Sequence, residues 1–69
     1  MSKYIISQAG KAGAEIEAAT HETAYRAMCC WYDPDIPVIV TDTETGAAEA
    51  FTRILDATGN LQKIERATV

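Results

Sequence analysis

Apolar and polar side chains alternate near the start of the chain, a pattern that is typical of strands. Residues 3–7 place tyrosine and isoleucine side chains on alternate faces, so they predict a first strand. Residues 8–13 contain two glycines and predict a turn. In residues 14–18, Ile16 stands between two glutamates, which directs the isoleucine inward and both carboxylates outward. The two segments together predict an antiparallel hairpin.

The apolar spacing becomes helical in the next part of the chain. Thr20 has the chemistry of an N-cap, and apolar residues then recur at positions i, i+3, i+4 and i+7. These apolar positions are Ala24, Ala27, Met28 and Trp31. The pair at 33–34, Asp-Pro, ends the predicted helix, because the residue before a proline avoids helical angles. The β-branched run at 38–41 then predicts a strand.

The last third of the chain allows two interpretations. The apolar residues of 46–58 fit a helical spacing, and Gly59 would then be the residue that caps the helix. Alternatively, Asp-to-Gly turn sequences on both sides enclose a strand at 47–55. We favour the strand, because the enclosed segment has a suitable length and residues 61–65 resume a strand-like pattern.

These elements predict one small α+β domain spanning 1–69. Its single helix packs on one face of an antiparallel sheet of four or five strands, in the order strand, strand, helix, strand, strand, strand. The predicted core consists of Ile6, Ile16, Ala24, Ala27, Met28, Trp31, Val38, Val40, Phe51 and Ile64. A chain of this length buries only about 60% of its extended surface, so a partner or a second copy would add useful burial.

Charge is unevenly distributed along the chain. Between Glu15 and Glu49 there are eight carboxylates and one base, Arg26, within a chain of net charge −4. This balance opposes direct binding to nucleic acid or to an anionic membrane. It favours a protein partner with a basic surface, although a solvated surface kept acidic for solubility explains it equally well. The candidate partner-binding residues are Glu15, Glu17, Tyr32, Asp33, Asp35, Asp42 and Glu44.

Two aromatic residues adjoin the carboxylates at the end of the predicted helix. Trp31 continues the apolar stripe, so we expect it to anchor the helix on the sheet. Tyr32 lies off that stripe, so we expect it to be exposed. An aromatic side chain beside carboxylates is typical of a binding hot spot.

Side chains with catalytic chemistry are few and poorly spaced. His21 precedes Cys29 and Cys30 by more than two helical turns, so these residues do not converge on a metal ion. The adjacent cysteines cannot join distant segments, and we expect reduced thiols in a cytoplasmic protein. The first residues lack the apolar stretch of a signal peptide. We therefore predict no enzymatic activity, no catalytic residue, no cofactor and no metal.

One family resemblance bears on function. The Tyr-Ile-Ile sequence at 4–6 opens the first strand, and 16–20 leads directly into an alanine-rich helix containing Ala24, Arg26 and Ala27. This arrangement resembles small phage-encoded anti-CRISPR proteins that act on type I-F surveillance complexes. The resemblance covers about the first 30 residues and implies a cytosolic inhibitor that occupies a Cas protein surface and blocks target DNA. Some such proteins use basic residues, whereas the middle of this chain is acidic, so no functional residue is carried over.

The sequence thus leads to one main functional hypothesis and one alternative. The main hypothesis is a small acidic protein-binding module that inhibits a nucleic-acid-handling complex such as a CRISPR effector. The alternative is a structural or self-associating domain, a homodimer formed through a sheet edge or through the end of the helix that carries the two aromatic residues.

Overall fold

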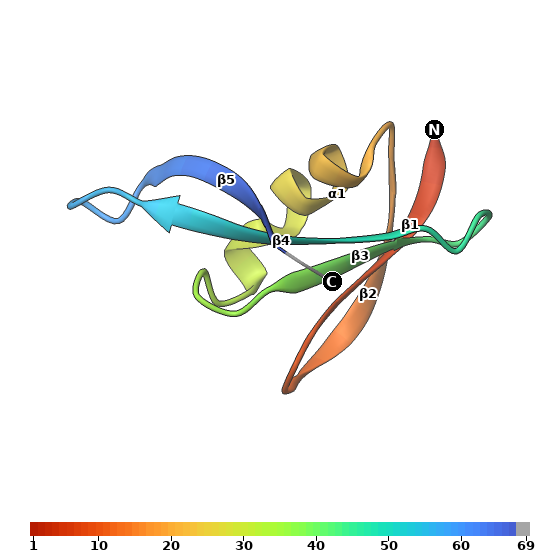
Figure 1. The fold of residues 1–69 in the computed structure, drawn as a ribbon, viewed down its shortest axis with the longest axis horizontal. Coiled ribbons are helices and arrows are strands. Elements are labelled where there is room, and N and C mark those ends of the chain that lie inside the picture. Colours follow the sequence, from red (N-terminus) through yellow and green to blue (C-terminus); the bar gives the residue numbers. More distant parts are fainter. Residues whose placement is uncertain (68–69) are drawn as a thin grey trace.

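An antiparallel sheet of five strands carries a single α-helix on one of its faces (Figure 1). The structure is a computed structural model, and it describes residues 1–67. The elements in chain order are β1 (Ser2–Gln8), β2 (Lys11–Ala18), α1 (His21–Met28), the 3-10 turn η1 (Cys29–Trp31), β3 (Val38–Asp42), β4 (Ala48–Leu55) and β5 (Leu61–Ala67). The predicted α+β architecture is confirmed, and so is the strand interpretation of the last third, because β4 lies where a helix was the alternative.

The strand order in the sheet is β2-β1-β3-β4-β5, so β2 and β5 are its two edges. The chain makes the β1–β2 hairpin, passes through α1 above the sheet, and returns as β3 on the other side of β1 (Figure 1). Tyr4 of β1 therefore lies opposite Ile16 of β2 and opposite Asp42 of β3. The β1–β2 hairpin runs steeply across the direction of β4, so the sheet is strongly twisted.

Two hairpin turns depend on an aspartate and a glycine. Gly46 and Gly59 have φ angles of 77° and 88°, a region in which a side chain is strained. Asp42 and Asp56 each accept backbone N–H groups within their own turn through Oδ1. A further hydrogen bond from the Thr58 hydroxyl, together with these N–H groups, holds the pKa of Asp56 below its usual range. These contacts explain why the turn sequences located β4 correctly.

The core lies between α1 and the face of the sheet that the helix covers. Tyr25 is fully buried and stacks on Phe51 with ring centroids 5.3 Å apart. The other buried members of this cluster are Tyr4, Ile6, Ala18, Ala24, Tyr32, Val38 and Val40. Ile16, Met28 and Ile64 are half-buried against it, so most of the predicted core is confirmed.

The predicted face of the helix was wrong in its phase. Positions 21, 24, 25 and 28 face the sheet, a stripe with the same spacing as the predicted one but starting three residues earlier. Ala27 is consequently exposed rather than part of the core. Trp31 is 69% exposed, and Tyr32 is buried, the reverse of what was predicted. The α-helix ends at Met28 and the chain continues as a 3-10 turn, so the α-helical spacing that predicted a buried Trp31 does not extend to that residue.

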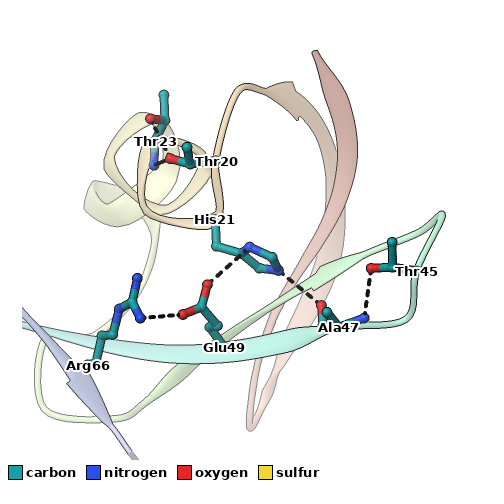
Figure 2. A network of polar contacts seen from close by, with 7 residues as sticks. All are labelled: Thr20, His21, Thr23, Thr45, Ala47, Glu49 and Arg66. Carbon is teal, nitrogen blue, oxygen red and sulfur yellow. Dashed lines mark hydrogen bonds and ion pairs between the residues drawn. The ribbon is translucent and has the colours of Figure 1, made fainter.

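Polar contacts fasten the start of α1 to the sheet (Figure 2). The Thr20 hydroxyl accepts the backbone N–H three residues later at 3.1 Å, which confirms it as the N-cap. His21 Nδ1 lies 3.1 Å from a carboxylate oxygen of Glu49, and Nε2 lies 3.0 Å from the carbonyl oxygen of Ala47. The second oxygen of Glu49 is 2.8 Å from Arg66. The network therefore joins α1, β4 and β5.

The opposite face of the sheet has no covering element among residues 1–67. Ile5 and Ile39 project from it and are 44% and 37% exposed. The only α-helix in this part of the chain has eight residues, and it is too short to cross a membrane.

Candidate protein-binding site

The most exposed aromatic side chain of the structure lies in the connection between α1 and β3. We define residues 29–37 as the Trp31 loop. Trp31 is 69% exposed, although a tryptophan side chain normally buries most of its large apolar surface. Ile36, in the same loop, is 38% exposed. With an exposed tryptophan and an exposed isoleucine, the loop presents apolar surface of the kind that binds another molecule.

Gln8 holds the second half of the Trp31 loop against the sheet. It lies at the end of β1 and is only 4% exposed. Its Nε2 donates to the carbonyl oxygens of Asp33 and Ile36, each at 2.9 Å. Its Oε1 accepts the backbone N–H of Asp33 at 3.1 Å. One buried side chain thus satisfies three backbone groups in the second half of the loop, where no helix or strand supplies their partners.

Two cations from other strands hold the first half of the loop. The guanidinium of Arg53, on β4, donates to the carbonyl oxygen of Cys29 and, at 2.8 Å, to that of Tyr32. Lys11, at the start of β2, donates from Nζ to the carbonyl oxygen of Trp31 at 3.0 Å. Gln8, Lys11 and Arg53 come from three different strands, so the backbone on both sides of Trp31 is fixed relative to the sheet.

Tyr32 holds the loop against the sheet through its buried side chain. Its side chain is 5% exposed, and its hydroxyl lies 3.5 Å from the carbonyl oxygen of Ile6. Tyr32 therefore belongs to the core and has no surface to offer a partner, contrary to the expected exposure. Trp31, which was expected in the core, takes the exposed place beside the carboxylates.

In the part of the chain that the structure describes, the acidic side chains of the Trp31 loop are unpaired, whereas the cations near the loop are bonded to its backbone. Asp33 and Asp35 are exposed, and within residues 1–67 neither carboxylate takes part in an ion pair. The two nearby cations, Lys11 and Arg53, direct their N–H groups at backbone carbonyl oxygens. Both aspartates are thus available to a cation supplied by a partner.

The remaining candidate carboxylates lie at the opposite end of β1. Glu15 and Glu17 project from β2 on the uncovered face, where Lys3 of β1 lies opposite Glu17 and approaches Glu15 at 3.6 Å. These residues and Ile16 line a shallow, open depression. The turn after β3 lies at the same end, because Thr43 donates its backbone N–H to the carbonyl oxygen of Lys3 at 3.1 Å.

Asp42 and Glu44 of that turn differ in their availability. Asp42 is 9% exposed, and its Oδ1 accepts the backbone N–H of Glu44 at 2.8 Å. It is committed to forming the turn and presents little surface. Glu44 is exposed. The fold therefore divides the seven candidate residues between the two ends of β1 and makes two of them, Tyr32 and Asp42, part of the interior.

Other reactive side chains form no catalytic constellation in the part of the chain that the structure describes. No three residues with metal-binding side chains converge there. Cys29 is half-buried, with its thiol 3.6 Å from the carbonyl oxygen of Arg26, and Cys30 is exposed. Burial raises the pKa of Tyr25, and the neighbouring Arg53 guanidinium acts in the opposite direction. This phenol is enclosed in the core, where no substrate can reach it.

Comparison with known proteins supplies no relative from which a function could be transferred. No protein-family model, curated protein or solved structure matches this chain. A fold of this kind does not by itself define a function, so the inference must come from the surface chemistry of the molecule. The Trp31 loop is the part of that surface where an exposed aromatic side chain, free carboxylates and a fixed backbone occur together.

Proposed function

We propose that the protein is a small acidic module that binds a protein partner with a basic surface through the Trp31 loop. The observation that supports this most directly is the 69% exposure of Trp31 on a backbone held by Gln8, Lys11 and Arg53. Tryptophan is among the residues most enriched in interface hot spots. A loop already fixed in the free protein loses little conformational entropy on binding, which leaves more of the contact energy as affinity.

Asp33 and Asp35 give this surface its charge preference. They follow Trp31 in the loop and form no ion pair within residues 1–67, so a basic partner would replace their water with charge-assisted hydrogen bonds. Long-range attraction would also increase the rate of encounter at low salt. Binding should therefore weaken as the ionic strength rises.

The same proposal names a class of partner and a mode of action. A basic surface that accepts this loop is also the kind of surface that binds nucleic acid, so occupying it would exclude the nucleic acid. The resemblance to type I-F anti-CRISPR proteins points to a CRISPR surveillance complex as the target. In this proposal the protein acts by steric and electrostatic competition and changes no covalent bond.

A competition assay tests the proposal. Purified type I-F surveillance complex is titrated with this protein, and binding of labelled target DNA is measured by fluorescence anisotropy. We expect the protein to displace DNA, and Trp31→Ala to weaken this displacement by at least about tenfold, as for a hot-spot residue. The matched control is Ile54→Ala, which truncates a 37% exposed side chain on β4, away from the loop.

A second variant for the same assay tests the charge of the loop without changing its shape. Asp33→Asn with Asp35→Asn keeps the shape of the loop, and it should weaken displacement and reduce its dependence on salt. Direct binding, measured calorimetrically, shows whether the complex is bound at all. If the Trp31→Ala variant binds the complex with unchanged affinity, the loop is not the binding site. If the original protein does not bind the complex at all, the proposed target class is wrong.

A further inference from the structure

The free edge of β5 has a sequence that is complementary to itself. The strand Leu61–Ala67 reads Leu-Gln-Lys-Ile-Glu-Arg-Ala and pairs with β4 on one side only. A free edge exposes backbone N–H and C=O groups to any strand that can approach. We propose that β5 pairs antiparallel with β5 of a second copy of this chain, in a register centred on Ile64.

In this register each residue of β5 meets a suitable partner across the new edge. Lys63 lies opposite the partner's Glu65, and twofold symmetry repeats the pair. Leu61 and Ala67 meet as an apolar pair, Gln62 and Arg66 meet as a polar pair, and Ile64 meets its own copy. Opposite charges placed directly across an antiparallel ladder stabilise it.

The two faces of β5 support this pairing. Lys63 and Glu65 lie opposite Ile54 and Thr52 of β4, on the uncovered face of the sheet, where their side chains are 60% and 48% exposed. They form an ion pair with each other at 3.0 Å, so both charged groups already lie close together on the same face of the sheet. Ile64 is on the helix side, half-buried against the core. A second Ile64 would complete its burial.

Charge also selects one register among the possible ones. A twofold antiparallel pair centred on Lys63, Glu65 or Arg66 would set a charged residue against its own copy, which is destabilising. Centring on Ile64 replaces these repulsions with two Lys–Glu pairs. Register in an edge pair is otherwise weakly determined, so this pattern supplies the missing specificity.

The other edge of the sheet shows the contrasting arrangement. On the uncovered face β2 carries Glu15 and Glu17 and no lysine or arginine. Its one base, Lys11, lies opposite Gln8 on the helix side and is bonded to the carbonyl oxygen of Trp31. A β2 edge facing its own copy therefore has no opposite charge to set against its glutamates. Charges at β2 protect the edge, whereas those at β5 complement a copy.

The resulting dimer has a continuous ten-stranded sheet. Its twofold axis runs perpendicular to the sheet, so both α1 helices lie on the same face. Pairing the edge adds hydrogen bonds and apolar burial to a domain whose size gives it a thin core. This interface uses no residue of the Trp31 loop, so the proposal does not depend on the proposed function.

A charge-exchange experiment tests the pairing and its register. Lys63→Glu alone and Glu65→Lys alone each place like charges opposite one another twice, and each should weaken the dimer by at least about tenfold. An equimolar mixture of the two variants sets opposite charges across the edge again, and it should form a heterodimer. The double variant Lys63→Glu/Glu65→Lys should dimerise like the original chain. Sedimentation equilibrium measures each association constant.

The control reverses a charge of the same kind elsewhere. Lys3→Glu disrupts the Lys3–Glu15 ion pair on the same face but far from β5, and it should leave dimerisation unchanged. Restoration in the mixture also separates repulsion across the edge from damage within one chain. A chain that stays monomeric at the highest attainable concentration, or a dimer indifferent to both single variants, overturns the proposal.

Discussion

The two ends of β1 use acidic residues in opposite ways. At the Lys3 end, Lys3 lies opposite Glu17 on the neighbouring strand and forms an ion pair with Glu15. At the Gln8 end, Asp33 and Asp35 form no ion pair with any residue that the structure describes, while the nearby Lys11 donates to a backbone carbonyl oxygen. The first arrangement offsets one of its two negative charges, and the second leaves both negative charges on a fixed loop. Availability to a partner therefore depends on where the cations point, and local sequence charge does not reveal this.

The strongest test of this difference removes Gln8. Gln8→Ala leaves three backbone groups of the Trp31 loop without partners, and we expect a loss of about 3 kcal/mol in the free energy of unfolding. Urea denaturation measures the loss. The control Ser7→Ala changes the adjacent residue, which is not fully buried, and should cost less than about 0.5 kcal/mol. Similar costs for the two variants would show that Gln8 does not support the loop.

A second test loosens the other side of the same loop. Both bonds come from one guanidinium nitrogen, Nη1, at the far end of the side chain. Arg53→Lys keeps the positive charge but shortens the side chain, so both contacts should weaken, and we expect a loss of about 2 kcal/mol. Trp31 fluorescence anisotropy should fall as the loop gains motion. The comparison variant Lys63→Arg exchanges a cation on β5 and should leave the anisotropy unchanged.

A third test concerns the core residue that Arg53 adjoins. The Tyr25 hydroxyl is buried without a hydrogen bond of good geometry among residues 1–67, so Tyr25→Phe should be neutral or stabilise by up to about 1 kcal/mol. Burial raises the pKa of Tyr25 above 10.0, the value expected when unfolded. The folded state therefore favours the protonated phenol, and stability present below pH 10 is lost as the pH rises further.

Unfolding measured between pH 8 and 11, the range that spans an ordinary tyrosine pKa of about 10, should show this alkaline loss. In the Tyr25→Phe variant the loss should be smaller, because one ionisable phenol of the core has been removed. An identical pH dependence in both proteins would mean that Tyr25 ionises as readily in the folded chain as in the unfolded one.

The fold was predictable because its signals are local. The β-branched run of β3 and the Asp-to-Gly turns on both sides of β4 determine strands from neighbouring residues alone. The helix was predicted, but its phase was not, since the apolar stripe that predicted it includes neither His21 nor Tyr25, which both face the sheet. The 3-10 turn in which Trp31 lies has no distinct sequence signal, so the exposure of Trp31 appears only in the structure.

The residues that support the candidate site were missed for a different reason. Gln8 and Arg53 bond to loop atoms more than twenty positions away in sequence, and a single glutamine or arginine gives no indication of such a contact. Their role follows from the strand order, which brings one end of β1 and the middle of β4 beneath the same loop. One signal was present: the loop contains two prolines, and its second half, residues 32–37, belongs to no helix or strand, so its buried backbone groups needed side-chain partners.

The smallest expected effect compares the lysines at the two ends of β1. Lys3→Ala removes an exposed ion pair, 3.6 Å long with both side chains more than half exposed, and should cost less than about 0.5 kcal/mol. Lys11→Ala removes a hydrogen bond to the carbonyl oxygen of Trp31 and should cost little more, about 1 kcal/mol. Only the second should alter the anisotropy of Trp31, because only Lys11 contacts that loop. A response to Lys3→Ala of equal size would mean that the two ends are mechanically coupled through β1, and the Trp31 loop could not then be treated as an independent surface.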